Sequence, residues 1–264
     1  MSLDGLFQNL WNDYIERLCP SAKKVHDLLE ENEALINDHI ALRTFSLSTC
    51  GIASLAKPFL ALGYKECGDY LFEKKHLTAK HYEHPDRTKP KVFISQLEVD
   101  LCSPLVQKIV KKMITQIDKE KLTHANFLYG GRLWDCSYQE YQQLAKESEY
   151  AAWLAAHGYG ANHFTVSVNQ LAEFDNVKSV NDHLRVNGFA INEAGGEVKG
   201  SAQVLLEQSS TMADKVSVQF SDGVETIPGG FYEFALRYPM NNGELYQGFV
   251  AASADKIFES TNES

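Results

Sequence analysis

Cysteine is scarce in this sequence, and the five that occur are never spaced as C-x-x-C. An odd number of scattered cysteines is typical neither of a disulfide framework nor of a zinc knuckle. We therefore expect free thiols in a reducing compartment, and we predict a cytoplasmic protein. The cysteines are Cys19, Cys50, Cys67, Cys102 and Cys136.

Positive charge is also in short supply, because 25 lysines and arginines face 35 acidic residues and leave a formal net charge of -10 at pH 7. No basic run offsets this balance, which argues against a nucleic-acid surface. No apolar run approaches the roughly 20 residues that a membrane-spanning helix needs. Nothing resembles the phosphate-binding pattern G-x-G-x-x-G either. We expect neither nucleic acid nor a membrane as a partner, and an acidic substrate would need arginines placed locally.

The first 35 residues are predicted to form two helices that cap the rest of the chain. Over residues 3–18, apolar side chains recur at helical spacing with three acidic residues among them. This pattern indicates an amphipathic helix and not a signal peptide. The second helix is expected over about residues 20–35.

One histidine-bearing strand pattern occurs twice, over residues 37–45 and again over residues 161–168. Because side chains alternate between the two faces of a strand, His39 and Arg43 are expected to point the same way. Each copy leads into a helix-like stretch that ends at a glycine followed by an aromatic residue, which suits the end of a helix and the start of a strand. The repeat predicts two copies of one β-α-β module, packed as a pseudo-symmetric pair.

The chain is therefore predicted to be α+β, with a single catalytic domain over residues 1–264 in which two modules share one site. The N-terminal helices span 1–35, the first module 36–102, a helical insert 103–158 and the second module 159–258. Further strands are expected near 64–67, 70–74, 91–99, 189–192, 204–208, 216–220 and 231–238, and helices near 52–62, 103–121, 137–157 and 177–186. Residues 81–87 are polar and contain proline, so a surface loop is predicted there.

Two histidines and one carboxylate on one side of a metal leave three adjacent coordination positions open, which is the arrangement of non-haem Fe(II) oxygenases. His39 and His163 take the same place in the two modules, so a pseudo-twofold axis would bring them together. Glu233 lies in an otherwise apolar stretch, where burying its charge is costly unless a cation or a donor offsets it. The pattern predicts a metal site made of His39, His163 and Glu233 between the modules, where ligand sites are favoured.

These residues also have ordinary structural interpretations. A single histidine on a strand is more often a hydrogen-bonded residue than a metal ligand. Arg43 is either a strand-edge cation or a clamp for a substrate carboxylate, which a guanidinium binds through two hydrogen bonds. Arg237 shares the face of Glu233 and pairs either with a substrate carboxylate or with an acidic neighbour. His81 and His84 are spaced like ligands, but their polar surroundings favour surface residues.

Several segments, in the right order, resemble the 2-oxoadipate dioxygenase/decarboxylase family, which is related to the vicinal-oxygen-chelate superfamily. They are residues 39–45, 162–165, 208–210, 227–229 running into 232–234, and 248–258. The similarity spans most of the chain, which looks like a shorter branch of the family. The resemblance implies two vicinal-oxygen-chelate-like βαβββ modules that form a half-open mixed β-barrel around a metal site.

For the site, the resemblance implies that Fe(II) is held by His39, His163 and Glu233. It also implies that Arg43 and the tail around Ser253 contact a 2-oxo acid, with Arg43 important for catalysis. Family members of this kind convert 2-oxoadipate and O2 into 2-hydroxyglutarate and CO2, a step of lysine catabolism. The expected partners are thus a small 2-oxo acid and O2.

Two other functions are compatible with these residues. On the same scaffold, the metal could act as a Lewis acid in a lyase, an isomerase or a hydrolase, and such an enzyme consumes no O2. Alternatively, the cavity between the modules could bind a small acid without catalysis, in which case chelators would leave binding unchanged.

Overall fold

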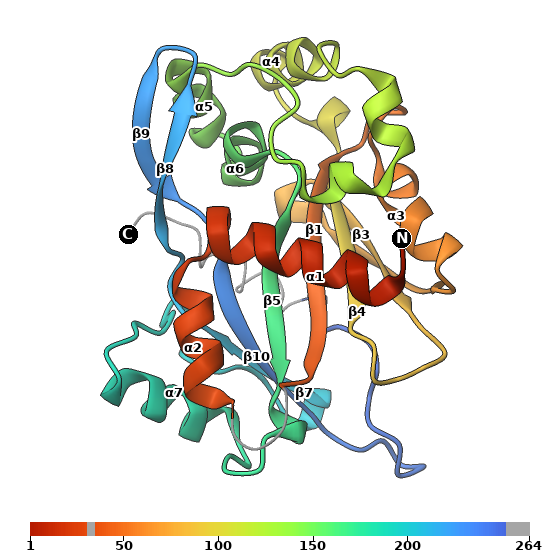
Figure 1. Cartoon of the computed structure of the whole chain (residues 1–264), viewed down its shortest axis with the longest axis vertical. Coiled ribbons are helices and arrows are strands. Elements are labelled where there is room, and N and C mark those ends of the chain that lie inside the picture. Colours follow the sequence, from red (N-terminus) through yellow and green to blue (C-terminus); the bar gives the residue numbers. More distant parts are fainter. Residues whose placement is uncertain (31–34, 252–264) are drawn as a thin grey trace.

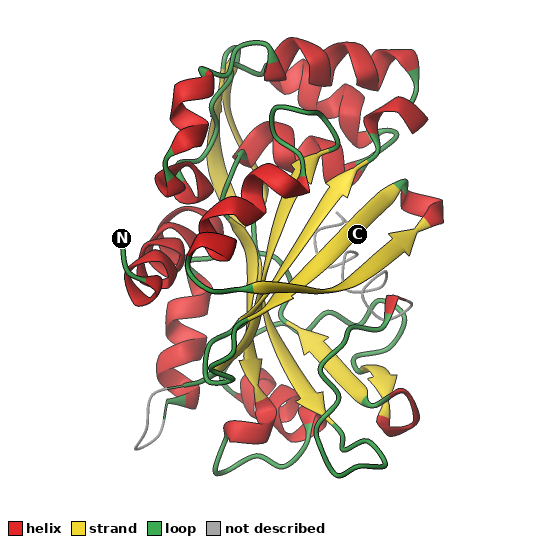
Figure 2. Ribbon diagram, turned by 90° about the vertical axis from the view of Figure 1, so that its right-hand side faces the viewer, coloured by secondary structure: helices red, strands yellow, loops and turns green. Residues whose placement is uncertain are grey.

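The centre of the molecule is a curled, eight-stranded mixed sheet that forms a half-barrel (Figure 1, Figure 2). The computed structural model describes residues 1–30 and 35–251. The strands lie in the order β2-β3-β4-β1-β5-β10-β7-β6. Their bounds are β1 Asn37–Phe45, β2 Lys65–Phe72, β3 Leu77–Glu83, β4 Lys91–Leu97, β5 Ala161–Ser167, β6 Lys199–Ser201, β7 Leu206–Ser210 and β10 Phe231–Arg237. This architecture confirms the predicted α+β class and the half-open mixed barrel.

The two halves of the sheet have the same strand order, counted outward from the centre. β1 and β5 are antiparallel neighbours at the centre. β4 is parallel to β1, as β10 is parallel to β5. Outside them, β3 and β2 continue one half and β7 and β6 continue the other, each antiparallel to its inner neighbour. A pseudo-twofold axis between β1 and β5 therefore relates the halves, and the hairpin of β8 (Lys215–Phe220) and β9 (Gly223–Pro228) is an addition to the second one.

One face of the sheet carries His39, His163 and Glu233, and is called the ligand face below. Most helices pack against the opposite face, whose side chains alternate with those of the ligand face. The helices on that opposite face are α1 (Leu3–Asp13), α2 (Ser21–Leu29), α3 (Ile52–Ala61) and α7 (Val177–Val186). α1 contacts Phe164 and α2 contacts Tyr232, each the neighbour of a ligand-face residue. Alternation along β5 and β10 thus points Phe164 and Tyr232 toward the helices, and His163 and Glu233 toward the site.

The N-terminal helix crosses β1 and β5 (Figure 1). It begins at the Ser2 cap, whose side chain accepts a hydrogen bond from the amide of Gly5, and it buries Leu6 and Leu10 on one face. A π-helical turn, Tyr14–Leu18, follows it. Both predicted helices are present, but the second ends at Leu29, earlier than expected.

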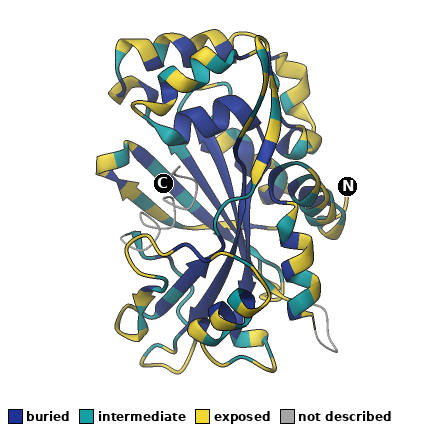
Figure 3. Ribbon diagram, turned by 90° about the vertical axis from the view of Figure 1, so that its left-hand side faces the viewer, coloured by how far each residue is buried: buried dark blue, intermediate teal, exposed yellow. Residues whose placement is uncertain are grey.

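Between β4 and β5 the chain is mostly helical, with α4 (Pro104–Ile114), α5 (Tyr138–Ala145) and α6 (Glu149–His157). Two short 3-10 turns lie between α4 and α5. α6 is buried from Tyr150 to its end, where it passes between the sheet and the outer helices (Figure 3). It therefore covers one end of the ligand face. No helix within the described ranges is both long and apolar enough to cross a bilayer.

The structure corrects several of the sequence predictions. Residues 65–72 form one strand, β2, where two strands were expected over 64–74. The predicted loop over residues 81–87 begins inside β3, and His81 is buried there. The expected strand at 189–192 forms only an isolated bridge, whereas β9 was not predicted. Polar residues such as His81 enter a strand when distant partners satisfy them, and those partners are not visible in a local pattern.

Candidate metal centre

The three predicted ligands converge on neighbouring strands at the centre of the sheet. His39 lies on β1, His163 on β5 and Glu233 on β10, and all three are buried. Thr165 is paired with His39 across one strand junction and with Glu233 across the other. Because paired residues point to the same face, strand register alone places these side chains together.

The spacing of the donor atoms fits a metal ion. Nε2 of His39 is 3.3 Å from Oε1 of Glu233, and Nε2 of His163 is 3.5 Å from Oε2 of Glu233. The three ligand atoms all lie within 4.8 Å of one another. Among the described residues, Oε2 of Glu233 is buried without a hydrogen-bond partner. Leaving such an oxygen unsatisfied is costly, and a cation beside it removes the cost. Two imidazoles with one carboxylate suit a divalent transition metal.

Burial sets the charge states in this site. It lowers the pKa of His163 well below the usual value, and the charges of His39 and Arg43 act in the same direction. His163 therefore stays neutral, which is the form that binds metal. Burial also raises the pKa of Glu233, partly offset by His39 and by a hydrogen bond from Gln208. A metal cation would favour the ionised carboxylate still further.

A hydrogen-bonding residue precedes each histidine and orients its ring. Nδ1 of His39 is 2.7 Å from Oδ1 of Asp38, and Nδ1 of His163 is 3.1 Å from Oδ1 of Asn162. An oxygen acceptor at Nδ1 places the proton there and leaves the Nε2 lone pair for a metal. In this structure Nε2 of His39 lies 3.1 Å from the Thr165 hydroxyl. Gln208 donates to Oε1 of Glu233 at 2.7 Å. These orienting residues were not predicted from the sequence, although an acid or an amide precedes the histidine in both copies of the repeat.

Arg237 pairs with an acidic neighbour, which was one of its two predicted partners. It donates to both oxygens of Asp38, at 2.6 and 2.9 Å. Its remaining terminal nitrogen donates to the carbonyls of Tyr246 and Gly248. Burial would raise the pKa of Asp38, but the Arg237 charge and hydrogen bonds hold it well below the usual value. A direct role for Arg237 in binding substrate stays a prediction.

Arg43 lies on an interior strand, so it is not a strand-edge cation. Its guanidinium is buried and lies over the rings of Tyr150 and Trp153, 5.0 and 4.9 Å from their centroids. It also lines a cavity of about 360 Å³ whose wall includes Lys74 and Lys75. The structure thus places Arg43 beside aromatic rings and charged groups of both signs at the α6 end of the ligand face, since Glu147 and Glu149 line the same cavity. Ser253, the other predicted substrate contact, is outside the described residues.

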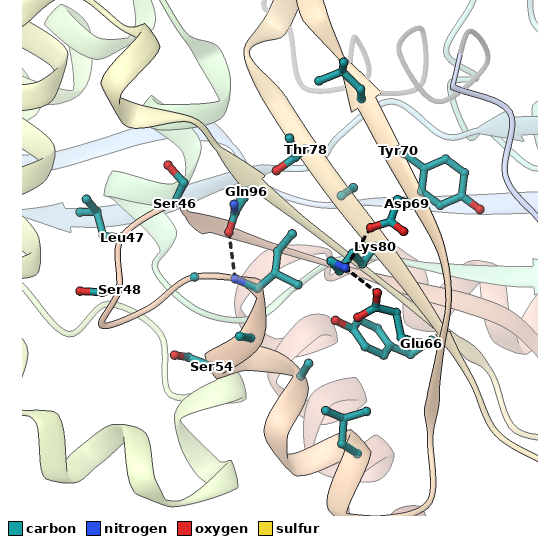
Figure 4. A pocket seen from close by; sticks show the side chains of 18 residues that line it. Ser46, Leu47, Ser48, Ser54, Glu66, Asp69, Tyr70, Thr78, Lys80 and Gln96 are labelled. Atoms are coloured by element: carbon teal, nitrogen blue, oxygen red, sulfur yellow. Dashed lines mark hydrogen bonds and ion pairs between the residues drawn. The ribbon is translucent and has the colours of Figure 1, made fainter.

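A larger cavity lies on the other side of the sheet. Its volume is about 860 Å³, and its wall comes from α3 together with the outward side chains of β2 and β3 (Figure 4). Lys80 projects into it and pairs with Glu66 and Asp69. None of the three candidate ligands lines this cavity, so its size does not connect it with the metal centre.

The family model for 2-oxoadipate dioxygenase/decarboxylase matches residues 9–246. The chain belongs to this family. Two plant relatives of the same name are each 35% identical to it. For the chloroplastic protein of Arabidopsis thaliana, 92% of this chain and 73% of the relative are aligned. For the chloroplastic/amyloplastic protein of Oryza sativa subsp. japonica, 97% of this chain and 78% of the relative are aligned. The resemblance found in the sequence is thereby confirmed.

Solved structures agree with this assignment. The hydroxyglutarate synthase of Oryza sativa in complex with 2-oxoadipate has a TM-score of 0.88 at 35% identity, with 97% of this chain and 91% of that chain covered. A Shewanella frigidimarina protein, provisionally described as a hydrolase, has a TM-score of 0.91 at 57% identity, with 94% and 98% covered. A protein from Ralstonia eutropha JMP134, provisionally assigned to the glyoxalase superfamily, shares the fold with a TM-score of 0.71 at 22% identity, with 93% and 85% covered.

Proposed function

We propose that this protein is an Fe(II)-dependent dioxygenase and decarboxylase that converts 2-oxoadipate and O2 into 2-hydroxyglutarate and CO2. The observation that carries the proposal is the buried set of His39, His163 and Glu233, in which one carboxylate oxygen has no hydrogen-bond partner among the described residues. Membership of the family and the likeness to a hydroxyglutarate synthase bound to 2-oxoadipate support the substrate.

The ligands hold the metal and their neighbours keep the ligands in place. When bound, Fe(II) supplies sites for both the 2-oxo acid and O2 and the redox chemistry that joins them. Asp38 and Asn162 accept from the Nδ1 atoms, so both Nε2 atoms face inward. Burial keeps His163 neutral and closes the site to competing water.

Arg43 is proposed to bind a carboxylate of the substrate. It lies four positions after His39 along β1, which puts their Cα atoms about 13 Å apart at the usual rise of a strand. A long guanidinium side chain covers part of that distance, and a six-carbon diacid reaches across the rest. A shorter 2-oxo acid would engage either Arg43 or the metal, so the spacing favours a substrate as long as 2-oxoadipate.

The atoms of the reaction balance without a further co-substrate. The carboxylate next to the keto group leaves as CO2, and the former keto carbon becomes the new carboxyl carbon. The adjacent carbon gains a hydroxyl group, and the two atoms of O2 account for the two new oxygens. Holding the shortened acid in place matters, because a displaced acid would not be hydroxylated.

The test is anaerobic loading with Fe(II), followed by a panel of 2-oxo acids with O2 uptake, CO2 release and product mass measured together. We expect equal uptake and release with 2-oxoadipate, and a 2-hydroxy acid that carries both atoms of isotopically labelled O2. CO2 release or hydrolysis without O2 uptake would favour a Lewis-acid enzyme and overturn the proposal. Tight binding of the acid with no turnover, unchanged by chelators, would favour a binding protein.

A further inference from the structure

A second group of metal-binding side chains lies at the edge of the sheet, on β2 and β3. It consists of Cys67, His81 and Glu83, whose donor atoms all lie within 4.8 Å of one another. His81 is buried, Glu83 is half-buried and Cys67 is exposed. Nε2 of His81 is 3.0 Å from Oε1 of Glu83. The group shares no residue with the site formed by His39, His163 and Glu233.

A β-bulge brings the thiol into this group. The pairing of β2 with β3 shifts between Glu66 and Gly68, so Cys67 is an extra residue with no partner across the strands. Bulges redirect a side chain from its regular alternation and often occur next to sites. Gly68 leaves room for the imidazole, because a Cβ atom there would lie 2.9 Å from the His81 ring. The local geometry therefore places a sulfur, a nitrogen and a carboxylate at one point.

The histidine of this group is oriented by a second hydrogen bond, as metal-bound histidines usually are. Nδ1 of His81 is 2.8 Å from the hydroxyl of Tyr70. That hydroxyl also accepts a hydrogen bond from the amide of Phe249 at 3.1 Å. Because Tyr70 occupies Nδ1, Nε2 is the nitrogen directed toward Glu83 and available to a metal.

We propose that Cys67, His81 and Glu83 form a second divalent-metal site that takes a zinc-class ion. A thiolate, an imidazole and a carboxylate suit Zn(II), and three protein ligands leave a fourth position for water. Binding would displace the proton of the Cys67 thiol, and Nε2 of His81 would supply the nitrogen ligand. The acidic residues Glu66 and Asp69 do not compete, because they pair with Lys80 on the other face of the strands (Figure 4).

This site is connected to the candidate metal centre of His39, His163 and Glu233 through one aromatic side chain. The ring of Phe249 lies 5.4 Å from that of His81 and 4.8 Å from that of His39, measured between centroids. A metal on His81 would fix Tyr70, and Tyr70 holds the main chain of Phe249. Zinc at the sheet edge is therefore expected to stiffen the chain beside His39.

The experiment titrates the metal-free, full-length protein with Co(II) and records its near-ultraviolet spectrum. A thiolate bound to Co(II) gives a charge-transfer band, which a site of two histidines and a glutamate cannot give. We expect this band in the wild type, its loss on adding equimolar Zn(II), and two bound Co(II) ions per chain. In Cys67→Ser the band should disappear and one bound ion should remain.

Two further variants make the result specific. Glu83→Gln should weaken Co(II) binding at the thiolate site at least tenfold, and Cys102→Ala, at a buried cysteine elsewhere, should keep the band. Absence of the band in the wild type, or its persistence in Cys67→Ser, would overturn the proposal. If Glu233→Ala loses the ion at the His39–His163–Glu233 site but keeps the band, the two sites bind metal independently. This test therefore does not depend on the proposed dioxygenase activity.

Discussion

Arg237 and Asp38 form a buried two-point ion pair, with 2.6 Å between Nε and Oδ2 and 2.9 Å between Nη2 and Oδ1. Oδ1 of Asp38 also lies 2.7 Å from Nδ1 of His39. Arg237 in turn donates to the carbonyls of Tyr246 and Gly248. One arginine therefore connects a candidate metal ligand with the segment that carries Phe249.

Arg237→Gln should destabilise the metal-free protein by about 3–5 kcal/mol, because it leaves Asp38 charged and buried without its partner. Urea unfolding followed by circular dichroism measures this change. Arg185→Gln, which breaks an exposed set of ion pairs, is the control and should change stability little. An equal effect of the two variants would mean that the buried pair has no special role.

Gln208 is predicted to tune metal affinity without being a ligand. Gln208→Ala removes the 2.7 Å hydrogen bond to Oε1 of Glu233, which leaves the carboxylate less well oriented. The dissociation constant for Fe(II) or Co(II) at the His39–His163–Glu233 site should rise about 10- to 100-fold. Anaerobic calorimetry on Cys67→Ser as the background isolates this site from the second one.

The matched control for that measurement is Gln219→Ala on β8. Its side chain donates to nearby carbonyls in the hairpin, at Phe220 and Gly223. Metal affinity should stay at the background value. An unchanged affinity in Gln208→Ala as well would show that Glu233 needs no orienting partner.

Arg43 is predicted to act on the substrate and not on the metal. Arg43→Lys keeps the charge but loses the planar, two-point geometry that suits a carboxylate. kcat/KM for 2-oxoadipate should fall on the order of a hundredfold, the usual effect of truncating a buried charged hydrogen-bond partner. Fe(II) affinity should change less than about threefold, since Arg43 is no part of the donor set.

Arg132→Ala is the control, because this arginine bonds to the Gln219 carbonyl and contacts the Phe220 ring at the β8–β9 hairpin. It should leave kcat/KM near the wild-type value. If Arg43→Lys turns over low concentrations of substrate at nearly the wild-type rate, Arg43 does not bind the substrate.

The metal ligands could be predicted from sequence because their placement follows from strand register. His39 and His163 occupy the same place in a repeated pattern, and a pairing of β1 with β5 brings such places together. Glu233 was recognisable as a lone carboxylate in an apolar strand. The residues that orient these ligands, Asp38 and Asn162, carried a signal too, since each directly precedes its histidine.

The burial and the contacts of residues near the edge of the sheet could not be predicted from the sequence in the same way. His81 lies in a polar segment, yet it is buried in contact with Tyr70 and Phe249, and Phe249 is far away in the sequence. The module boundaries, the cytoplasmic location and the place in lysine catabolism stay predictions. The five cysteines are all free, as their spacing indicated.

His157 should make the protein less stable in acid. Burial lowers its pKa to about 3, although the hydrogen bond between Nε2 and the Pro228 carbonyl, 2.8 Å long, partly opposes the shift. The folded protein therefore keeps His157 neutral where the unfolded chain, with a pKa of about 6.5, binds a proton. This contribution to stability is complete above about pH 6.5 and is lost progressively as the pH falls toward 3.

Between pH 7 and pH 5 the wild type should lose about 2 kcal/mol more of its free energy of unfolding than His157→Gln, whose amide donates to the same carbonyl but does not titrate. The comparison uses urea unfolding of both proteins at both pH values. The contributions of carboxylates and other histidines to the change in unfolding free energy then cancel. His124→Gln, at an exposed histidine, should follow the wild type. If His157→Gln loses as much stability as the wild type, the buried imidazole already takes up a proton in the folded state.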